Sequence, residues 1–344
     1  MFVKNCWYVA AFDEEVSAQR PIARRILGEP IVLFRQPDGP VAALEDRCCH
    51  RGLPLSRGEM NGKFLRCNYH GLEFDASGAC VRIPGQDSIP PAARVRSYPL
   101  AQRGRALWIW MGNPQLADPA AIPAFPWFED RDWGWKSKMF HIRCNYEMLH
   151  DNLLDLTHLA YVHSQTLGGN PDTHFNADTK TSRTDRGVRV SRWLRNSEPS
   201  PTYVKLGKFA GRVDRWQEFE FVPGLITLYG GAVDAGTITA DDQRKGGVHM
   251  RLFDAITPET ATTTLNFFCV GQNFRVGEPQ VTQLLFSELE RTVLEDVEVL
   301  EAQQARIQET RGKFVDIKAD AAAIQARRIV SALRSQESSI SQPE

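Results

Sequence analysis

The sequence predicts an α+β protein with two domains, in which an all-β N-terminal domain is followed by a domain that combines an antiparallel sheet with flanking helices. Three observations lead to this prediction. Short apolar runs separated by turn residues fill the first third of the chain, a proline-rich segment follows, and the remainder mixes helical periodicity with strand-like alternation. With 344 residues, the chain is long enough to build two hydrophobic cores.

The N-terminal domain is predicted from short strands. Residues 30–35 and 41–44 are apolar runs joined through Asp38-Gly39, a strong turn signal, and together they predict a β-hairpin. Residues 106–111 form a further apolar run that turn residues follow directly, so we expect a strand that closes this domain.

A proline-rich connector separates the two domains. Its prolines exclude a long helix and indicate an extended linker; they are Pro114, Pro119, Pro123 and Pro126. We therefore predict an N-terminal domain at residues 1–115 and a second domain, which includes the linker, at residues 116–334. The polar composition of residues 335–344 predicts a frayed C-terminal tail.

The second domain opens with a helical pattern. Residues 145–161 contain no proline and space their leucines among polar residues, and Gly168-Gly169 is expected to stop the helix. Residues 180–275 alternate like antiparallel strands, and residues 281–310 predict a long helix.

The overall composition excludes several classes of protein. The 41 basic and 42 acidic side chains give a formal net charge of -1, so binding of nucleic acid through bulk positive charge is not expected. No run approaches the ~20 apolar residues of a membrane span, and the N-terminus lacks the pattern of a secretory signal. Seven cysteines, an odd number, argue against a disulfide framework and for reduced thiols or metal ligands. We therefore expect a cytoplasmic protein without a nucleic-acid or membrane partner.

The sharpest chemical signal is a pair of short loops, each of which offers one thiol and one imidazole. One residue separates Cys48 from His50, two residues separate Cys67 from His70, and a glycine ends each loop. A [2Fe–2S] cluster with two Cys ligands on one iron and two His ligands on the other is of the Rieske type, and this spacing lets each loop supply both irons. A structural zinc site is the alternative, although common zinc spacings group the cysteines and the histidines separately.

A second group of potential ligands lies in the helical segment. Asn152, Asp155 and His158 follow one another a turn apart on one face of an ideal helix. His163 lies about 140° round the helix from His158, so both imidazoles reach one metal ion only if the helix bends or ends between them. An isolated histidine on a helix is usually a surface or core residue, and this pair therefore needs a carboxylate from elsewhere in the chain.

The long helix offers Asp296 as that carboxylate. Asp296 falls inside the apolar stripe of the helix, where an unpaired carboxylate costs several kcal/mol and requires a counter-charge or a metal ion. Four further acidic residues of the helix fall outside the stripe and predict a solvated face; they are Glu288, Glu295, Glu298 and Glu301. Two imidazoles and one carboxylate form the facial triad of non-haem Fe(II) oxygenases. An error in the register assumed for the helix, or an i,i+4 pair with a residue outside the stripe, is the alternative for Asp296.

The sequence resembles the Rieske non-haem iron oxygenases, and within them the vanillate O-demethylase and dicamba monooxygenase group. The resemblance is carried by residues 5–10, by the Cys-x-His-Arg-Gly and Cys-x-Tyr-His-Gly loops, by the Asp-x-x-His-x-x-x-x-His block, and by Glu-Asp ahead of Val-Leu-Glu-Ala-Gln-Gln. It implies a Rieske [2Fe–2S] domain followed by a catalytic domain of helix-grip-like arrangement. It also implies that Cys48, His50, Cys67 and His70 hold the cluster, and that His158, His163 and Asp296 hold a mononuclear Fe(II).

The resemblance further implies a redox partner and a trimer. The chain has no Gly-x-Gly-x-x-Gly loop that opens a helix after a strand, so an NADH-dependent flavin and iron–sulfur reductase, or a ferredoxin, is expected to supply the electrons. In the family, the cluster of one subunit of a homotrimer donates electrons to the iron of the neighbouring subunit, across an acidic residue. Asp155 matches that residue and is expected to accept hydrogen bonds from His158 and, across the subunits, from His70. The alternative for Asp155 is that it only orients a ligand histidine. Asn152 is expected beside the iron.

The function that this resemblance implies is that of an oxygenase component, which uses O2 to O-demethylate or hydroxylate a substituted aromatic acid. Aromatic ring dioxygenation, and monooxygenation of another small aromatic compound with a sulfonate, N-methyl or alkyl substituent, share the same iron chemistry and stay open. A Rieske electron carrier or a zinc-structured binding module is the alternative of another class, and neither needs the second group of ligands. Arg192 and Arg251 are candidate partners for a substrate carboxylate.

Overall fold

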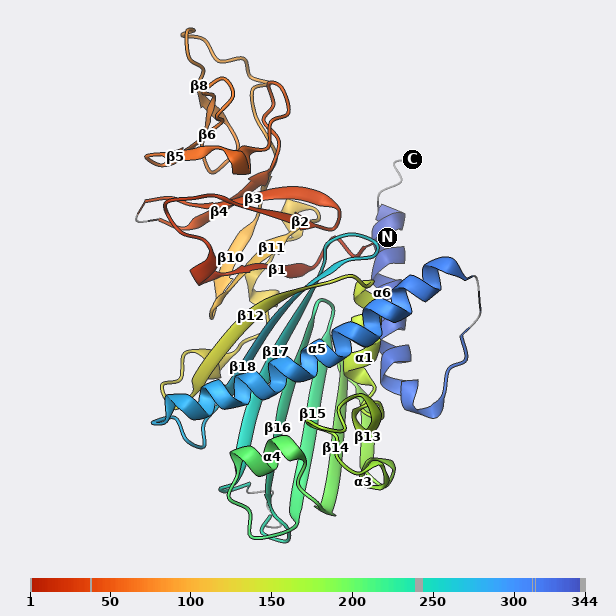
Figure 1. Ribbon diagram of the computed structural model, residues 1–344. Helices are drawn as coiled ribbons and strands as arrows, with labels where there is room; N and C mark the ends of the chain where they lie inside the picture. The colour runs from red at the N-terminus through yellow and green to blue at the C-terminus, as the bar shows by residue number, and fades with distance from the viewer. Residues whose placement is uncertain (1, 38, 239–243, 311, 313, 341–344) are drawn as a thin grey trace. The chain divides into compact units, whose positions relative to one another are not determined.

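The protein folds into two compact units, which are described separately below (Figure 1). The computed structural model describes residues 2–37, 39–238, 244–310, 312 and 314–340. The first unit consists of Met1–Pro126 and Thr257–Ala261, and the second of Trp127–Ile256 and Thr262–Glu344. The proline-rich connector therefore packs as part of the first unit.

The first unit is all-β, as predicted, and contains three small sheets. Its strands are β1 (Trp7–Phe12), β2 (Ile22–Ile26), β3 (Glu29–Arg35), β4 (Val41–Glu45), β5 (Glu59–Asn61), β6 (Phe64–Arg66), β7 (Glu73–Phe74), β8 (Cys80–Arg82), β9 (Ser97–Tyr98), β10 (Leu100–Arg103) and β11 (Ala106–Trp110). The sheets have the orders β1-β11-β10, β2-β3-β4-β9 and β5-β6-β7-β8. The predicted hairpin is confirmed, because β3 pairs antiparallel with β4 and Arg35 lies opposite Val41. Asp38, at its turn, lies outside the described residues.

Strand β3 divides the interior of the first unit into two apolar cores. Successive side chains of a strand point to opposite faces, and here both faces are buried. Ile31 enters a core that includes residues of β1 and β11. Val32 and Phe34 enter the other core, which also contains Cys48 and Cys67. The two candidate cluster thiols are therefore anchored in the packed interior.

The proline-rich connector is not the extended linker that the sequence predicts. It forms three single-turn 3-10 helices, η3 (Pro114–Leu116), η4 (Pro119–Ala121) and η5 (Pro126–Phe128). In the first two, a proline occupies the start of the helix, where its missing N–H costs nothing, and Asn113 or Asp118 caps the turn. The prolines do exclude a long helix, as expected.

The second unit is built on a seven-stranded sheet of order β12-β18-β17-β16-β15-β14-β13, whose described pairs are antiparallel. Its strands are β12 (Gly134–Ile142), β13 (Asp178–Arg183), β14 (Val188–Ser197), β15 (Val213–Val222), β16 (Leu225–Asp234), β17 (Val248–Pro258) and β18 (Thr264–Gln272). The strands predicted within residues 180–275 are confirmed. Strand β12, which pairs with β18 at the edge of the sheet, is an addition to the prediction.

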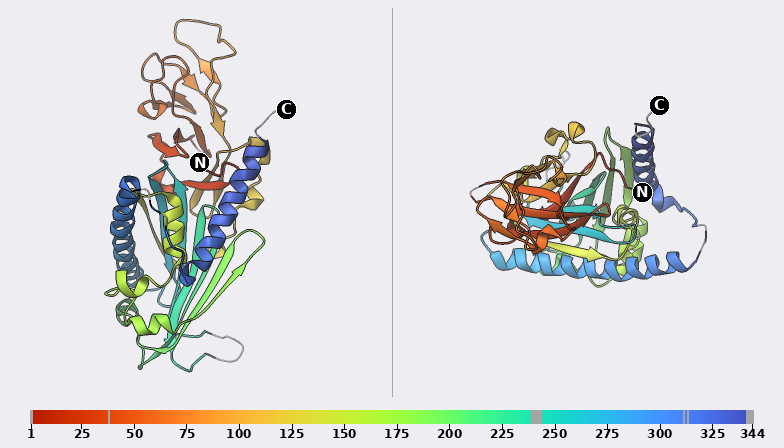
Figure 2. Two further views of the ribbon diagram at one scale, coloured as in Figure 1. Left: turned by 90° about the vertical axis from the view of Figure 1, so that its right-hand side faces the viewer. Right: turned by 90° about the horizontal axis from the view of Figure 1, so that it is seen from above.

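Two helices lie across one face of this sheet, as Figure 1 and Figure 2 show. They are α1 (Tyr146–Leu154) and α5 (Pro279–Glu309), and α5 confirms the long helix predicted at residues 281–310. The shorter helices are α2 (Leu159–Val162), α3 (Pro171–Phe175) and α4 (Pro201–Leu206). Among the helices of the described residues, none combines the length and the apolar composition that a membrane crossing requires.

The C-terminal segment is helical, which corrects the prediction of a frayed tail from residue 335. Helix α6 (Ala321–Ile340) packs against α1, β13 and β14, and residues 341–344 lie outside the described residues. Ala322, Ala326 and Val330 are buried on its inner side. This packing extends the helix into a segment whose polar composition alone predicts fraying.

Candidate metal centres

The two cysteine–histidine loops of the first unit share one main-chain framework. In each loop the cysteine amide donates to the carbonyl of a leucine five residues on, and the glycine four residues on donates back to the cysteine carbonyl, at 2.8–3.0 Å. The glycines, Gly52 and Gly71, have φ values of 74° and 75°, a left-handed conformation that glycine adopts without strain. The loops are therefore two copies of one turn, which present their ligands in the same way.

The thiols and the imidazoles of these loops lie at different depths. Cys48 and Cys67 are 2% and 1% exposed, whereas His50 and His70 are exposed, with ring centroids 4.4 Å apart. Burial, with a contribution from the neighbouring thiol of Cys67, raises the pKa of Cys48 to about 11. A thiol of this kind loses its proton when it binds a metal. Two buried thiols and two adjacent surface imidazoles fit a Rieske cluster with a sulfur-ligated inner iron and a nitrogen-ligated outer iron.

In the second unit, the predicted helix is interrupted at Asp155, which corrects the prediction of one continuous face through Asn152, Asp155 and His158. The Oδ1 atom of Asp155 accepts hydrogen bonds from the main-chain amide (2.8 Å) and the hydroxyl (2.7 Å) of Thr157. This Asx turn competes with the helical hydrogen bonds, so α1 ends just before it. The chain restarts as α2, with His158 at its N-terminal end and His163 at its C-terminal end.

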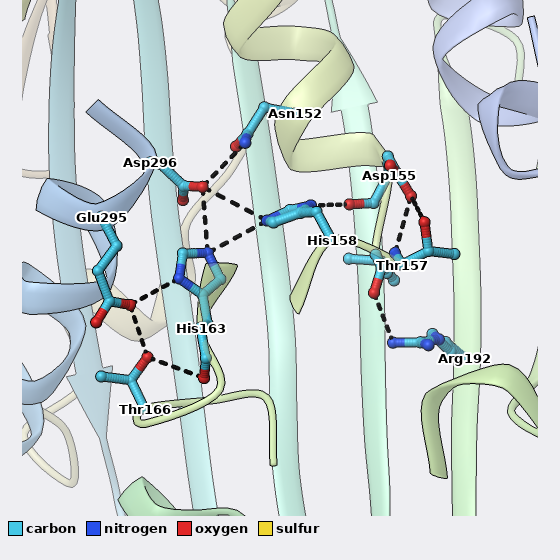
Figure 3. Close-up of polar contacts among 10 residues, drawn as sticks. Asn152, Asp155, Thr157, His158, His163, Thr166, Arg192, Glu295 and Asp296 are labelled. Carbon is cyan, nitrogen blue, oxygen red and sulfur yellow. Dashed lines mark hydrogen bonds and ion pairs between the residues drawn. The ribbon is translucent and has the colours of Figure 1, made fainter. Parts of the chain in front are cut away.

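The interruption brings His158 and His163 together with Asp296 of α5 (Figure 3). The Oδ1 atom of Asp296 lies 3.1 Å from His163 Nε2 and 3.5 Å from His158 Nε2, and the two Nε2 atoms are 3.2 Å apart. Neighbouring ligands of an octahedral ion with bonds of about 2.1 Å lie about 3.0 Å apart, so this triangle fits one face of such an ion. Asp296 is 7% exposed, which confirms the burial that its place in the apolar stripe predicts.

Each of these histidines uses its other ring nitrogen to bind the protein. The Nδ1 atom of His163 lies 2.8 Å from Glu295 Oε2, and the Nδ1 atom of His158 contacts the main-chain carbonyl of Asp155. Because both neighbours are acceptors, Nδ1 carries the proton in each ring and the Nε2 lone pairs are left for a metal ion. The carbonyl contact corrects the prediction that the Asp155 carboxylate accepts from His158, since that carboxylate is engaged by Thr157.

Glu295 belongs to this site, although its position outside the apolar stripe predicts a solvated face. Its Oε2 atom also accepts from the hydroxyl of Thr166 (2.9 Å), a side chain with no exposed surface. Glu295 and Asp296, successive residues of α5, thus contact the two ring nitrogens of His163 (Figure 3). A ligand histidine commonly donates its second ring nitrogen to a carboxylate. The carboxylate of Glu295, next to the ligand Asp296 in the sequence, is therefore a candidate for that acceptor.

The electrostatics of the site favour a cation between the three ligands. Burial opposes protonation of His163, but the carboxylates of Asp296 and Glu295 outweigh it and raise the pKa of His163. Burial lowers the pKa of His158, and the His163 ring adds to this while Asp296 opposes it. Asn152 lies beside the ligands, where its amide donates to Asp296 Oδ1 (2.9 Å). Glu295 also pairs with Arg291 through its other oxygen (3.4 Å), so the space between the three ligands is left for a proton or, in its place, a metal ion.

Comparisons with known proteins identify the family of this chain. A model of the Rieske [2Fe-2S] domain matches residues 6–99, and a model of the vanillate O-demethylase oxygenase C-terminal domain matches residues 142–336. The iron-sulfur subunit of a toluene-4-sulfonate monooxygenase system from Comamonas testosteroni is 38% identical over 337 residues, which cover 97% of each chain. The oxygenase component of dicamba O-demethylase from Stenotrophomonas maltophilia is 35% identical and covers 98% of this chain and 99% of its own. The chain belongs to the Rieske non-haem iron oxygenases.

The fold of the whole chain is that of a Rieske oxygenase component. A crystal structure of dicamba monooxygenase bound to dicamba superimposes with a TM-score of 0.90 at 34% identity, over 98% of this chain and 99% of the other. A further crystal structure of that enzyme contains non-heme iron. The protein is an oxidoreductase, and its cofactors are a Rieske [2Fe–2S] cluster and a mononuclear non-haem iron. When bound, these groups supply electron transfer and O2 binding, respectively.

Neither arginine that the sequence offers for a substrate carboxylate of this Rieske oxygenase is placed for that role. Arg192 is 2% exposed and its guanidinium already donates to several protein acceptors. Arg251 lies on the opposite face of the sheet, because the strand pairing places Met250, and not Arg251, in the row of Arg192. There it stacks on Tyr229 and Trp127, with its guanidinium 3.8 Å and 4.7 Å from the ring centroids.

Proposed function

We propose that this protein oxidises an aromatic acid, with a carboxylate or sulfonate group, at a methyl or methoxy substituent of its ring. The observation that carries the proposal is the convergence of His158, His163 and Asp296 in a chain whose relatives over nearly the full length act on toluene-4-sulfonate and on dicamba. A Rieske electron carrier has no use for these three side chains. O-demethylation and methyl hydroxylation are the same reaction at the reacting carbon, because both replace a C–H bond of a one-carbon substituent by C–O.

The reaction needs an external electron donor. One oxygen atom of O2 enters the substrate and the other leaves as water, which consumes two electrons and two protons beyond those of the C–H bond. We propose that an NADH-dependent flavin and iron–sulfur reductase, or a ferredoxin, supplies these electrons to the cluster. The proposal includes a homotrimer, and a cytoplasmic location in which the seven free cysteines stay reduced.

In this proposal the ligand roles follow the two donor sets. The cluster ligands are Cys48, His50, Cys67 and His70, and the ligands of the mononuclear iron are His158, His163 and Asp296. Asn152 holds the Asp296 carboxylate through its amide. Asp155 contacts His158 through its main-chain carbonyl, and we assign its carboxylate the link to the cluster of a neighbouring subunit. The burial of the two thiols and the Nε2 geometry of the two histidines support these assignments.

A substrate panel with product analysis tests the proposed function. Reconstituted protein is given a reductase of this family, NADH, O2, and matched pairs of benzoates and benzenesulfonates with either a methyl or a methoxy substituent. Formaldehyde release from methoxy substrates, or benzylic alcohols from methyl substrates, supports the proposal. The benzylic alcohol is expected to carry one 18O atom from labelled O2, because its oxygen does not exchange with water. Formation of ring cis-diols instead identifies a ring dioxygenase, and NADH oxidation without any oxidised product contradicts the proposed substrate class.

A further inference from the structure

Arg192 is a buried cation whose direct contacts are all uncharged groups. It lies in the middle of β14, on the side of the sheet that faces the iron ligands, and is 2% exposed. In the part of the chain that the structure describes, no carboxylate forms an ion pair with it. Burial lowers its pKa to about 10, and the charge of the nearby Arg215 adds to this, while the charge of Asp155 opposes it. Burying a charge costs free energy, and the hydrogen bonds of the guanidinium offset this cost. The segments that these hydrogen bonds hold therefore indicate what Arg192 does.

These hydrogen bonds reach both ends of the segment that carries the histidine ligands. On one side, Nη1 donates to the main-chain carbonyl of Leu156 (3.1 Å), two residues before His158. On the other side, Nη2 donates to the main-chain carbonyl of His174 (2.8 Å), and Nη1 lies 3.1 Å from the Nδ1 atom of the same residue. The side-chain carbonyl of Gln217, on the neighbouring strand β15, accepts from Nη1 (3.1 Å) and fixes the guanidinium to the sheet.

The contact to His174 continues to the main chain of the second ligand. Because the guanidinium is a donor, the Nδ1 atom of His174 accepts, and its Nε2–H donates to the Gly168 carbonyl (2.9 Å). Burial lowers the pKa of His174 to about 4, and the charges of Arg215 and Arg192 contribute, so the ring is neutral at neutral pH. The Gly168 amide donates in turn to the main-chain carbonyl of His163 (2.8 Å).

We propose that Arg192 is a positioning residue, whose single guanidinium sets the spacing of His158 and His163 by tying the segments next to both of them to the sheet. The segment between the two histidines is the short helix α2, whose own hydrogen bonds to the carbonyls of His158 and Leu159 hold the turn together but do not tie it to the sheet. A lysine offers one nitrogen in place of a planar fork and cannot reach both sides equally. This inference rests on the proposed function, in which the two histidines bind the iron.

Substitution of Arg192 tests the proposal with readouts that do not depend on turnover. We expect Arg192→Met to speed amide hydrogen exchange across residues 155–175 in metal-free protein, and to weaken Fe(II) binding at least tenfold. The EPR signal of the Fe(II)–nitric oxide complex is expected to change, because it reports ligand geometry, while the Rieske signal of the reduced cluster stays as in the wild type. Arg192→Lys is expected to lie between the two. The matched control is Arg189→Met, on the same strand, which removes an exposed guanidinium paired with Glu220 and is expected to change none of these.

The outcomes separate positioning from general stability. If Arg192→Met melts at a lower temperature but binds Fe(II) with the wild-type dissociation constant and the wild-type nitric oxide signal, the residue is merely structural and the proposal is overturned. If Arg192→Met does not fold, Arg192→Lys and His174→Leu decide: wild-type Fe(II) affinity in both overturns the proposal, and weakened affinity with an intact Rieske signal supports it. Absence of Fe(II) binding in the wild type contradicts the proposed function instead.

Discussion

Glu295 and Asp296 hold His163 from both sides, and this arrangement decides how the ring is used. Glu295 accepts a hydrogen bond from Nδ1–H, Asp296 lies at Nε2, and Thr166 fixes the orientation of Glu295. A carboxylate on the outer nitrogen keeps a ligand imidazole in one tautomer and raises its basicity. Removing the charge of Glu295 therefore weakens the metal site without removing a ligand.

We expect Glu295→Gln to weaken Fe(II) binding about 10- to 100-fold, as the loss of an outer partner of a ligand histidine typically does. Glutamine keeps the shape of the side chain but carries no charge, so the effect reports the electrostatic contribution. Anaerobic titration of Fe(II) into cluster-loaded protein measures it. Glu290→Gln, on the same helix, removes only a half-exposed ion pair with Lys138 and serves as the control. Equal dissociation constants for the two variants would show that Glu295 does not support the metal.

Asp254 is a buried acid on β17 that makes the free energy of unfolding depend on pH. Burial raises its pKa to about 7, the charge of Asp296 adds to this, and the amide of Asn266 (3.2 Å) opposes it. Between the pKa of an unfolded aspartate and pH 7, the folded protein keeps a proton that the unfolded chain releases. The free energy of unfolding therefore falls as the pH rises through this window.

We expect Asp254→Asn to remove this fall and to raise the free energy of unfolding at pH 8, by at most about 4 kcal/mol. Below pH 4 the two proteins are expected to be equally stable, because aspartate is then protonated in both states. Urea denaturation at pH 4, 6 and 8 checks this. The control is Asp214→Asn, whose single amide oxygen can accept from only one of the main-chain amides of Asn196 and Gly236, so one hydrogen bond is lost and the variant is expected to be less stable. A variant of Asp254 that is less stable at pH 8 than the wild type contradicts the account.

The interruption of the first helix at Asp155 marks where sequence periodicity stops being informative. The pattern of residues 145–161 is helical throughout, and it correctly shows that His158 and His163 share one ion only if the helix bends or ends. The break itself depends on the Thr157 amide and hydroxyl reaching the Asp155 carboxylate, a local bond that competes with the helix. Apolar periodicity carries no information on that competition. Asp296, in contrast, was predictable, because a charge inside an apolar stripe is visible in the sequence.

Asp155→Asn tests the role proposed for this carboxylate in electron transfer. The amide oxygen of asparagine still accepts from Thr157, so the turn and both metal centres are expected to persist. We expect electron transfer from the cluster to the iron to slow by at least tenfold, because the proposal assigns the negative charge of Asp155 a place between the cluster of one subunit and the iron of its neighbour. Single-turnover kinetics after reduction of the cluster measures this rate, and Asp151→Asn, four residues earlier on α1, is the control. An Asp155→Asn rate equal to the wild-type rate would leave Asp155 with an orienting role only.

The two cluster loops differ in their tolerance of a side chain. Gly52 and Gly71 have the same left-handed φ, but a Cβ atom at Gly52 meets nothing within 4 Å, whereas at Gly71 it lies 2.9 Å from Pro84 Cγ. We expect Gly52→Ala to cost about 1–2 kcal/mol of folding free energy from the conformation alone. Gly71→Ala is expected to cost more and to lower the cluster content, as thermal melting and Rieske absorbance show. Equal losses in the two variants would mean that Pro84 moves freely.

Across the chain, the sequence indicates the two domains and both sets of ligands, because these depend on local patterns. The order of the seven strands and the packing of α6 depend on contacts between distant residues. The buried alanines of α6 illustrate this, since Ala322 and Ala326 show no sign of a partner until α1 and the edge strands are in place. The roles of Glu295 and Arg192 differ from those that the sequence predicts for the same reason. Their partners, His163 and Leu156, come from segments more than thirty residues away.

The claim that one chain builds two separate iron centres is tested most directly by iron and sulfide analysis of the wild type and of Asp296→Ala. After anaerobic reconstitution, the wild type is expected to hold three irons and two acid-labile sulfides per chain. Asp296→Ala is expected to lose one iron and to keep both sulfides and the Rieske EPR signal of the reduced protein. An unchanged iron content in Asp296→Ala, or a reduced wild type without a Rieske signal, would contradict the account.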